Sequence, residues 1–280
     1  MAGLGNLPKE ERFEGKGGLK IAYRTWKPAG AAKAAVLIVP GFNSHSGYYD
    51  LTAKQLAAPG LVVYAVDLRG RGMSDGERFY VDAIDDYAGD VDGLMQIAKT
   101  QQPGLKVFML GHSAGGVTSC IYALDHGSEI SGLICESFAY QTPAPDFALA
   151  ALKGLSHLAP HARVVALPNK DFSRDSTVVE AMNADPLIAH ETQPTKTMAA
   201  LARADERLKN SFGKITVPVL ILHGTADKAT KPSGSQAFFD QAGSKDKTLK
   251  LYDGHYHDML NDIGKEQVMA DIQEWIAARI

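Results

Sequence analysis

The sequence predicts an α/β protein built on one mainly parallel sheet. Short apolar runs alternate with helical patterns along the 280 residues, which is the signature of βαβ units. The central runs are rich in β-branched residues and end at glycine or at a polar residue, as buried parallel strands do. An apolar content of 45% fits one large soluble domain that carries an insertion.

Seven apolar runs are expected to form the strands of this sheet. They cover residues 19–26, 34–41, 61–70, 106–113, 130–138, 217–224 and 247–254. A last helix is expected over residues 264–279. Because ligands of open α/β sheets bind beyond the carboxyl ends of the strands, the residues that follow each run are the first candidates for a site.

One connection is too long for an ordinary crossover between neighbouring strands. Residues 139–216 separate the fifth run from the sixth, whereas connections in such sheets are usually short. The segment contains helical stretches over residues 146–158, 175–185 and 195–210, with prolines between them. We therefore expect a core of residues 1–138 and 212–280, and a helical cap of residues 139–211 inserted over the top edge of the sheet.

The first helix of this expected cap is apolar over more than one narrow stripe. Its apolar residues are Phe147, Leu149, Ala151, Leu152, Leu155 and Leu158. Two interpretations stay open. The helix is buried against its own domain, or part of its surface lines an acyl pocket or makes transient contact with a lipid surface, as exposed apolar patches often do.

Charge and cysteine usage exclude several classes of function. The net charge is −3, and 29 basic and 32 acidic residues are interspersed, so no basic stripe predicts nucleic acid as a partner. Cys120 and Cys135 fall in apolar segments and are expected to be buried small residues, not a disulfide or a metal site. The N-terminus lacks the pattern of a signal peptide and no run of about 18 apolar residues occurs, so we expect a cytoplasmic protein.

The pentapeptide G-H-S-A-G at residues 111–115 is the strongest indication of chemistry. It follows the apolar run KVFML directly and precedes a helical stretch of small residues. In a nucleophile elbow, a serine occupies a strained turn between a strand and a helix, and the flanking glycines let the backbone fold tightly enough to expose its hydroxyl. Ser113 is therefore the candidate nucleophile.

A serine nucleophile needs a base, and the base needs an acid that holds its tautomer. Asp227 lies three residues past the strand that ends at residue 224, and is the candidate acid. The alternative is a turn aspartate that caps the helix beginning near Pro232. The loop after the last strand offers His255 and His257, of which we choose His257. A metal site at these two histidines is not supported, because no third ligand cluster accompanies them.

Ester or amide hydrolysis also requires donors for the oxyanion that forms on the attacked carbonyl. The backbone N–H of Ala114, the residue after the nucleophile, is one expected donor. The second is the backbone N–H of Phe42, in the loop PGFNSHSG after the strand AAVLIV, where Gly41 lets the loop approach closely. The alternative for this loop is an ordinary turn at the end of a strand.

Several motifs in order resemble the α/β hydrolases of the monoacylglycerol lipase and lysophospholipase type. They are PGFNSHSGYYD (40–50), VDLRGRGMSDGER (66–78), GHSAGG (111–116), FSRDSTVVEAMNADPLIAH (172–190), PVLILHGTADKATKPSGS (218–235) and LYDGHYHDMLND (251–262). The resemblance spans nearly the whole chain. It implies an α/β-hydrolase fold with a cap that narrows access to a linear acyl chain.

For the site, the resemblance implies Ser113 as nucleophile, Asp227 as acid and His257 as base, with the N–H groups of Phe42 and Ala114 as the oxyanion hole. The implied substrate is a monoacylglycerol or a similar acyl ester, and no cofactor or metal is implied. A lysophospholipase, a broad carboxylesterase and a non-catalytic ligand-binding relative are the alternatives. The chain departs from the family at Pro40-Gly41, where His-Gly is usual, at Phe42, where a small residue is common, and at Ala114, where methionine is common.

Overall fold

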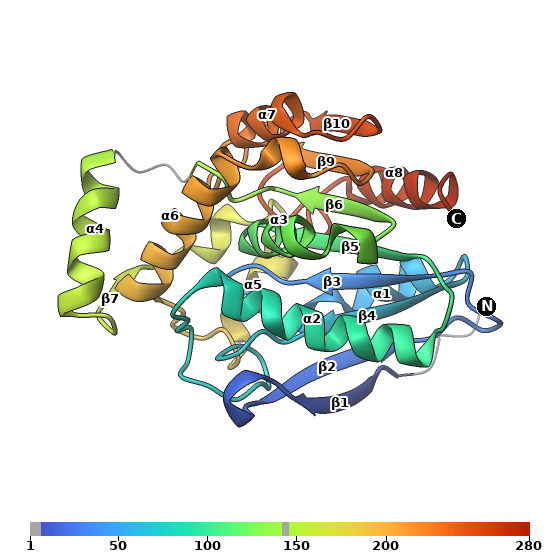
Figure 1. Ribbon diagram of the computed structural model, residues 1–280, viewed down its shortest axis with the longest axis horizontal. Helices are drawn as coiled ribbons and strands as arrows, with labels where there is room; N and C mark the ends of the chain where they lie inside the picture. Colours follow the sequence, from blue (N-terminus) through green and yellow to red (C-terminus); the bar gives the residue numbers. More distant parts are fainter. Residues whose placement is uncertain (1–6, 142–145) are drawn as a thin grey trace.

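The computed structural model describes residues 7–141 and 146–280, which form an eight-stranded sheet with helices on both faces (Figure 1). The strand order is β1-β2-β4-β3-β5-β6-β9-β10. The strands β3 (Ala34–Val39), β4 (Leu61–Val66), β5 (Val107–His112), β6 (Gly132–Glu136), β9 (Val219–Gly224) and β10 (Lys247–Tyr252) pair in parallel. The predicted α/β-hydrolase fold class, with its mainly parallel sheet, is thus confirmed.

The antiparallel edge of the sheet is formed by the N-terminal strands β1 (Lys9–Glu14) and β2 (Lys20–Trp26). All seven predicted runs contain strands, but most strands end two to four residues before the run does: the run 61–70, for example, leaves the sheet after Val66. The strand β1 was not predicted. Its sequence KEERFE is mostly charged and largely exposed, because it is an edge strand with one neighbour.

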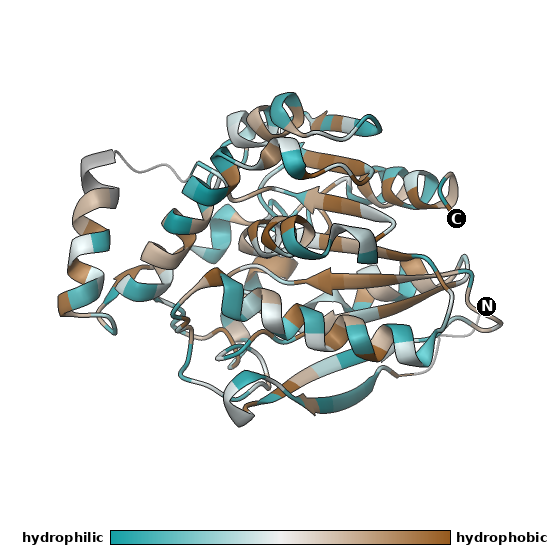
Figure 2. Cartoon of the chain, in the orientation of Figure 1, coloured by the Kyte–Doolittle hydropathy of each residue, from teal (hydrophilic) through white to brown (hydrophobic). Residues whose placement is uncertain are grey.

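Side chains of the central strands alternate between two apolar cores, one on each face of the sheet. Along β3, Ala35, Leu37 and Val39 face one core and Ala34, Val36 and Ile38 face the other. The first core is covered by α2 (Ile84–Gln101), α3 (Ala114–His126) and α7 (Pro232–Gln241), and the second by α1 (Asp50–Ala57) and α8 (Lys265–Ala277). Figure 2 shows the brown apolar strands enclosed between these helices.

An inserted segment, residues 137–218, connects β6 to β9 beyond the carboxyl ends of the strands. It contains α4 (Asp146–Leu158), β7 (Arg163–Val165), α5 (Ser176–Ala184), β8 (Gln193–Pro194) and α6 (Thr195–Lys209). The short strands β7 and β8, which pair antiparallel, were not expected. In Figure 1, α4 lies at the far left beyond α6, on which it packs. One face of α6 belongs to the first core through Ala200, Leu201, Ala204 and Leu208.

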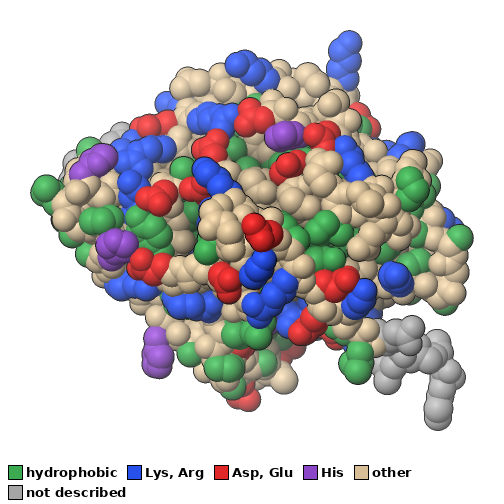
Figure 3. All heavy atoms as spheres, turned by 60° about the horizontal axis from the view of Figure 1, so that its bottom comes forward, with side chains coloured by type: hydrophobic (Ala, Val, Ile, Leu, Met, Phe, Trp, Pro, Cys, Tyr) green, Lys and Arg blue, Asp and Glu red, His purple; other side chains and the backbone are tan. Residues whose placement is uncertain are grey.

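The surface and the cysteines agree with the composition of the chain. Figure 3 shows acidic and basic side chains interspersed over the face turned to the viewer.

Cys120 and Cys135 are free and fully buried, as predicted. Their sulfur atoms lie 3.8 Å apart. Among the described helices, none has both the length and the apolar content that crossing a bilayer would demand.

Candidate active site

Ser113 occupies the tight turn between β5 and α3. Its backbone has φ 55° and ψ −120°, a conformation that non-glycine residues rarely adopt and that persists only where the surroundings enforce it. Two hydrogen bonds hold this conformation. The N–H of Ser113 donates to the carbonyl of Glu136 (2.9 Å), and the N–H of Gly116 donates to the carbonyl of Ser113 (2.9 Å). The elbow predicted from the pentapeptide is present.

Glycines beside the elbow allow two close approaches of the backbone. A Cβ on Gly115 would lie 2.0 Å from the carbonyl oxygen of Val39, so the start of α3 presses directly on the end of β3. A Cβ on Gly41 would lie 2.8 Å from the Cβ of Ser113 and 3.5 Å from the backbone nitrogen of Ala114. The loop after β3 therefore reaches the nucleophile only because residue 41 has no side chain.

Asp227 lies in the loop after β9, and its buried carboxylate is held by several donors. The Oδ1 atom accepts the N–H groups of Ala229 (2.8 Å) and Thr230 (3.0 Å), and the Oδ2 atom accepts the hydroxyl of Thr230 (2.8 Å). Asp227 thus forms a local turn. It does not cap α7, whose N-cap residue is Lys231 and has no side-chain capping bond.

His257 lies in the loop after β10, and its Nδ1 atom is 2.8 Å from the Oδ2 atom of Asp227. Both side chains are fully buried. Burial opposes the charge of Asp227, but the imidazole charge of His257 and hydrogen bonds from His223 and His257 outweigh it, so the pKa of Asp227 lies well below its usual range. The other candidate base, His255, faces Asp262 instead, at 3.5 Å.

A second histidine, which was not predicted from the sequence, also contacts Asp227. The Nε2 atom of His223, at the end of β9, lies 3.1 Å from the same Oδ2 atom of Asp227. Its Nδ1 atom lies 2.7 Å from the hydroxyl of Ser235. With a proton on Nε2, the ring donates to Asp227 and accepts the hydroxyl of Ser235 at Nδ1. The position of His223, four residues before the acid at the end of a buried strand, was the signal for it.

Within the described residues, the Nε2 atom of His257 is buried and has no hydrogen-bond partner. The structure therefore brings Asp227 and His257 together, and places Ser113 in the turn after β5 without a hydrogen bond between its hydroxyl and His257. The ring of His112, the residue before Ser113, lies 4.9 Å from that of His257. Burial and the neighbouring His257 lower the pKa of His112 to about 3, so His112 is a neutral packing partner.

A group of potential metal ligands lies behind His257. The side chains of His112, Glu136 and Asp258 are buried, with ligand atoms within 4.8 Å of one another. Burial raises the pKa of both carboxyl groups, and the charge of Asp258 adds to this effect for Glu136. Both groups already accept hydrogen bonds within the protein: the Oε1 atom of Glu136 accepts the N–H of Leu260 (3.1 Å), and the Oδ2 atom of Asp258 accepts the amide of Asn261 (3.0 Å). The group therefore fits a role in holding the loop of His257 better than a metal site.

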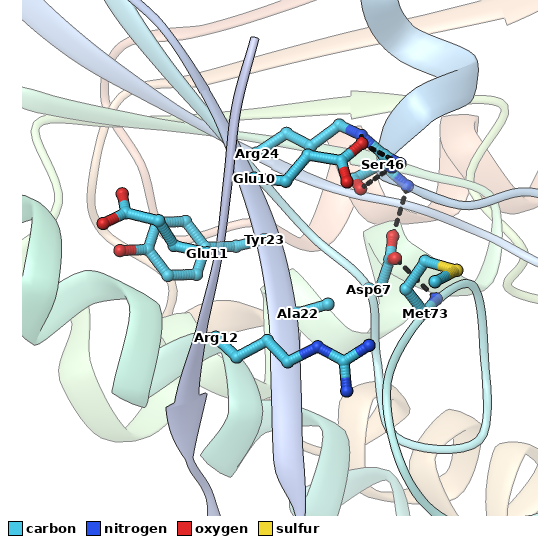
Figure 4. A pocket seen from close by; sticks show the side chains of 9 residues that line it. All are labelled: Glu10, Glu11, Arg12, Ala22, Tyr23, Arg24, Ser46, Asp67 and Met73. Carbon is cyan, nitrogen blue, oxygen red and sulfur yellow. Dashed lines mark hydrogen bonds and ion pairs between the residues drawn. The ribbon is translucent and has the colours of Figure 1, made fainter.

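The loop after β3 is held at its far end by charged side chains. Figure 4 shows the Oδ1 atom of Asp67 accepting the N–H of Ser46 (2.6 Å) and the Oδ2 atom accepting that of Met73 (2.8 Å). Arg24 donates to the hydroxyl of Ser46 (2.7 Å) and pairs with Glu10 (2.6 Å). The pocket in this view, about 360 Å³, shares no lining residue with the cavity at Ser113.

The cavity at Ser113 has a volume of about 380 Å³ and lies between the core and the inserted segment. Ser113 and Ala114 form part of its wall, and Asp171, Lys228 and Thr230 supply its polar groups. Its apolar lining is formed by Phe42, Ala139, Leu152, Val164, Val165, Leu167, Pro168, Phe172, Met198, Leu201 and Ala229. A mainly apolar cavity that ends at a strained serine is the shape expected for a site that takes an extended apolar group.

Of the apolar residues on α4, Leu152 lines this cavity, whereas Leu155 and Leu158 are 42% and 87% exposed. The side chains of Phe147 and Leu149 lie outside the described part of the chain. One side of α4 therefore contacts the cavity and another carries exposed leucines, whereas contact with a lipid surface stays a prediction.

Comparison with known proteins gives consistent matches over most of the chain. The family model described as serine aminopeptidase, S33 (Hydrolase_4) matches residues 30–264. The monoacylglycerol lipase of Mycolicibacterium smegmatis is 32% identical over 97% of this chain and 98% of its own length. The human monoglyceride lipase is 33% identical over 94% and 88% of the two chains. The crystal structure of Paleococcus ferrophilus monoacylglycerol lipase superposes with a TM-score of 0.84 at 30% identity, covering 93% of this chain and 99% of the other.

These matches agree with the fold, the elbow and the buried pair of Asp227 and His257. The strand order defines the fold, and the sequence identity to each of these relatives extends across both the core and the inserted segment. The chain belongs to the serine aminopeptidase S33 family of α/β hydrolases, and within it is a monoglyceride lipase-like ester hydrolase.

Proposed function

We propose that this protein hydrolyses monoacylglycerols or similar acyl esters through an acyl-serine intermediate. The observation that carries the proposal is the position of Ser113, which is held in an elbow conformation at the wall of a mainly apolar cavity of about 380 Å³. An acyl chain in that cavity would bring its ester carbonyl to the serine hydroxyl. The names of the relatives, monoacylglycerol lipase and monoglyceride lipase, support this choice of substrate.

In the proposed reaction, Ser113 attacks the ester carbonyl and His257 takes the hydroxyl proton at its Nε2 atom. The oxyanion accepts hydrogen bonds from the backbone N–H groups of Phe42 and Ala114. Ala114 is suited to this because the first N–H groups of a helix have no partner within it and carry the positive end of the helix dipole. His257 then protonates the departing alcohol. In the second half, His257 takes a proton from a water molecule that attacks the acyl carbonyl, and it returns this proton to the Ser113 oxygen as the fatty acid is released.

Asp227 would hold the proton of His257 on Nδ1, which leaves Nε2 as the base. The hydrogen bond of 2.8 Å between them supports this role. The nucleophile and base come within hydrogen-bonding distance when substrate fills the cavity, since such bonds are often long in the free enzyme. The chemistry requires neither cofactor nor metal.

Residues 139–211 would act as the cap over the cavity. Leu152, Val164 and Leu201 line the cavity from this part of the chain, whereas Leu155 and Leu158 face outward. We propose that the outward leucines and Val164, which is 42% exposed, make transient contact with lipid surfaces from which the substrate is taken. Vesicle co-sedimentation with Leu155→Ser/Leu158→Ser tests this contact: binding equal to that of the parent protein would contradict it.

The test of the mechanism is labelling with a fluorophosphonate followed by peptide mapping. Label on Ser113, together with loss of both label and ester turnover in Ser113→Ala, is the expected result. Turnover that survives in Ser113→Ala would overturn the mechanism. Separate variants His255→Ala and His257→Ala assign the base, and activity of His257→Ala equal to the parent enzyme would exclude that residue.

A panel of monoacylglycerols, lysophospholipids and nitrophenyl esters tests the substrate class. We expect the highest kcat/KM on monoacylglycerols, with a broad preference for chain length, because one methylene in an apolar pocket changes binding by only about 1–3 kcal/mol. A clear preference for lysophospholipids would replace the proposed activity with that of a lysophospholipase. Equal turnover of unrelated esters would indicate a broad carboxylesterase.

A further inference from the structure

Arg71, in the loop after β4, is a fully buried arginine outside the Ser113, Asp227 and His257 group. It is 1% exposed. Its Nη1 atom lies 2.5 Å from Oε1 of Glu191, its Nη2 donates to Oε1 of Gln193 (2.9 Å), and its Nε donates to the hydroxyl of Tyr87 (3.1 Å). Burial opposes the charge, but Glu191 outweighs it and raises the pKa of Arg71 above its usual value. Arg71 is thus a charged guanidinium at all working pH values.

The guanidinium of Arg71 lies over the ring of Phe42, with its central carbon 4.4 Å from the ring centroid. Phe42 also lines the cavity at Ser113, so its ring is held between the guanidinium and the substrate space. A planar cation over an aromatic face is attractive, and more so where water is excluded. The side chain of the residue proposed to donate the second oxyanion hydrogen bond is therefore seated on Arg71.

The loops that carry these two residues are also joined through the backbone. Asp67, at the start of the loop of Arg71, accepts the N–H of Ser46 in the loop of Phe42 and that of Met73 within its own loop (Figure 4). On the opposite side, the amide of Asn43 donates to the carbonyl of Leu167 (2.9 Å) in the inserted segment. The position of Phe42 is thus determined by contacts from the core and from the inserted segment together.

We propose that Arg71 is a positioning residue for the oxyanion hole: anchored by Glu191 and Gln193 of the inserted segment, it sets the position of the Phe42 N–H through the stacked ring. The inference rests on the proposed function, in which this N–H binds the oxyanion. It follows that the inserted segment contributes to catalysis through Glu191 and Gln193 as well as to binding of the acyl chain. It also accounts for a bulky residue at position 42, since a small side chain would offer the guanidinium no face on which to lie.

The experiment compares Arg71→Met and Arg71→Lys with a matched control, Arg69→Met. Arg69 lies in the same loop and pairs with the buried Asp90 (2.7 Å and 2.9 Å), so its loss removes an equivalent buried ion pair on the other side of the loop. Three measurements are made on each variant. They are kcat and KM on nitrophenyl butyrate, the inhibition constant of a trifluoromethyl ketone that forms an oxyanion on the serine, and the melting temperature.

We expect Arg71→Met to lower kcat and to weaken the binding of the trifluoromethyl ketone, each by about 100-fold, because loss of one oxyanion donor costs on the order of 10²–10³ in kcat. KM should change less than about threefold. Arg71→Lys should recover part of kcat, since lysine keeps the charge but not the planar fork. Arg69→Met should lower the melting temperature and leave kcat and the inhibition constant within about threefold of the parent.

The pairing with the ring is tested by Phe42→Leu, which keeps the backbone N–H and removes the aromatic face. In that background, Arg71→Lys should have little further effect on kcat. If Arg71→Met does not fold, the same three measurements are made on Arg71→Lys and Glu191→Gln instead. An Arg71→Lys enzyme with kcat and inhibition constant within twofold of the parent would overturn the inference while leaving the proposed function intact. Absence of ester turnover and of fluorophosphonate labelling in the parent enzyme would instead overturn the proposed function.

Discussion

Asp227 and His257 are joined by a hydrogen bond of 2.8 Å between two fully buried side chains that lie 30 residues apart in the chain. The two residues come from the loops after β9 and β10, which are parallel neighbours in the sheet. Because parallel strands bring their carboxyl ends to one edge, residues far apart in sequence can meet there. The two loops are also joined by a hydrogen bond from the N–H of Ala226 to the carbonyl of His255 (3.1 Å).

Asp227→Asn should lower kcat by roughly 10³–10⁴-fold, because the amide no longer holds the Nδ1 proton of His257 and the wrong tautomer results. KM should change little, since Asp227 is not among the residues that line the cavity. Steady-state kinetics and the rate of fluorophosphonate labelling check this. A loss of less than tenfold in kcat would mean that His257 is oriented by other contacts.

His223→Ala should lower kcat by about tenfold, because a hydrogen bond to a charged group contributes on the order of 1.5 kcal/mol. His223 shares the Oδ2 atom of Asp227 with His257, so its loss removes one of the side chains that hold this carboxylate in place. Ser235→Ala, which alters only the outer hydrogen bond of His223, should have a smaller effect on kcat. Steady-state kinetics check this, and a kcat of His223→Ala equal to that of the parent enzyme would contradict the role of His223.

Glu136→Gln should make the protein relatively more stable as pH rises. Burial, and then the charge of Asp258, raise the pKa of Glu136 well above 4.5 in the folded state. Above pH 4.5 the unfolded chain releases a proton that the folded chain keeps, so unfolding is increasingly favoured as pH rises. The glutamine cannot ionise and lacks this penalty. The free energy of unfolding of both proteins can be measured in urea at pH 5 and at pH 8. The value for the variant minus the value for the parent should be more positive at pH 8 than at pH 5.

Gly115→Ala should destabilise the fold by about 3 kcal/mol, because its Cβ would meet the carbonyl oxygen of Val39 at 2.0 Å. Gly89→Ala is the matched control, since no atom lies within 4 Å of a Cβ at this exposed position of α2. That change should stabilise by about 0.5–1 kcal/mol, as alanine is the better helix former. Equal unfolding midpoints in urea for the two variants would contradict the close approach.

The fold, the elbow and the pairing of Asp227 with His257 could be predicted because their signals are local. The elbow at Ser113 is contiguous with a buried strand, and Asp227 and His257 follow apolar runs directly. The strand β1 was missed because an edge strand with exposed charged side chains has no apolar pattern to detect. Arg71 was missed for another reason: its partner Glu191 lies 120 residues away, and only the packed chain brings the two together.

The crowding around Asp227 has a consequence for where protons can go. A carboxylate offers about four lone-pair positions. Backbone N–H groups of Ala229 and Thr230, the hydroxyl of Thr230, and the rings of His223 and His257 already lie within hydrogen-bonding distance of them. In the proposed reaction, a proton that passes from Ser113 to His257 would therefore find no vacant acceptor site on Asp227. It would stay on the imidazole and leave again from the Nε2 atom.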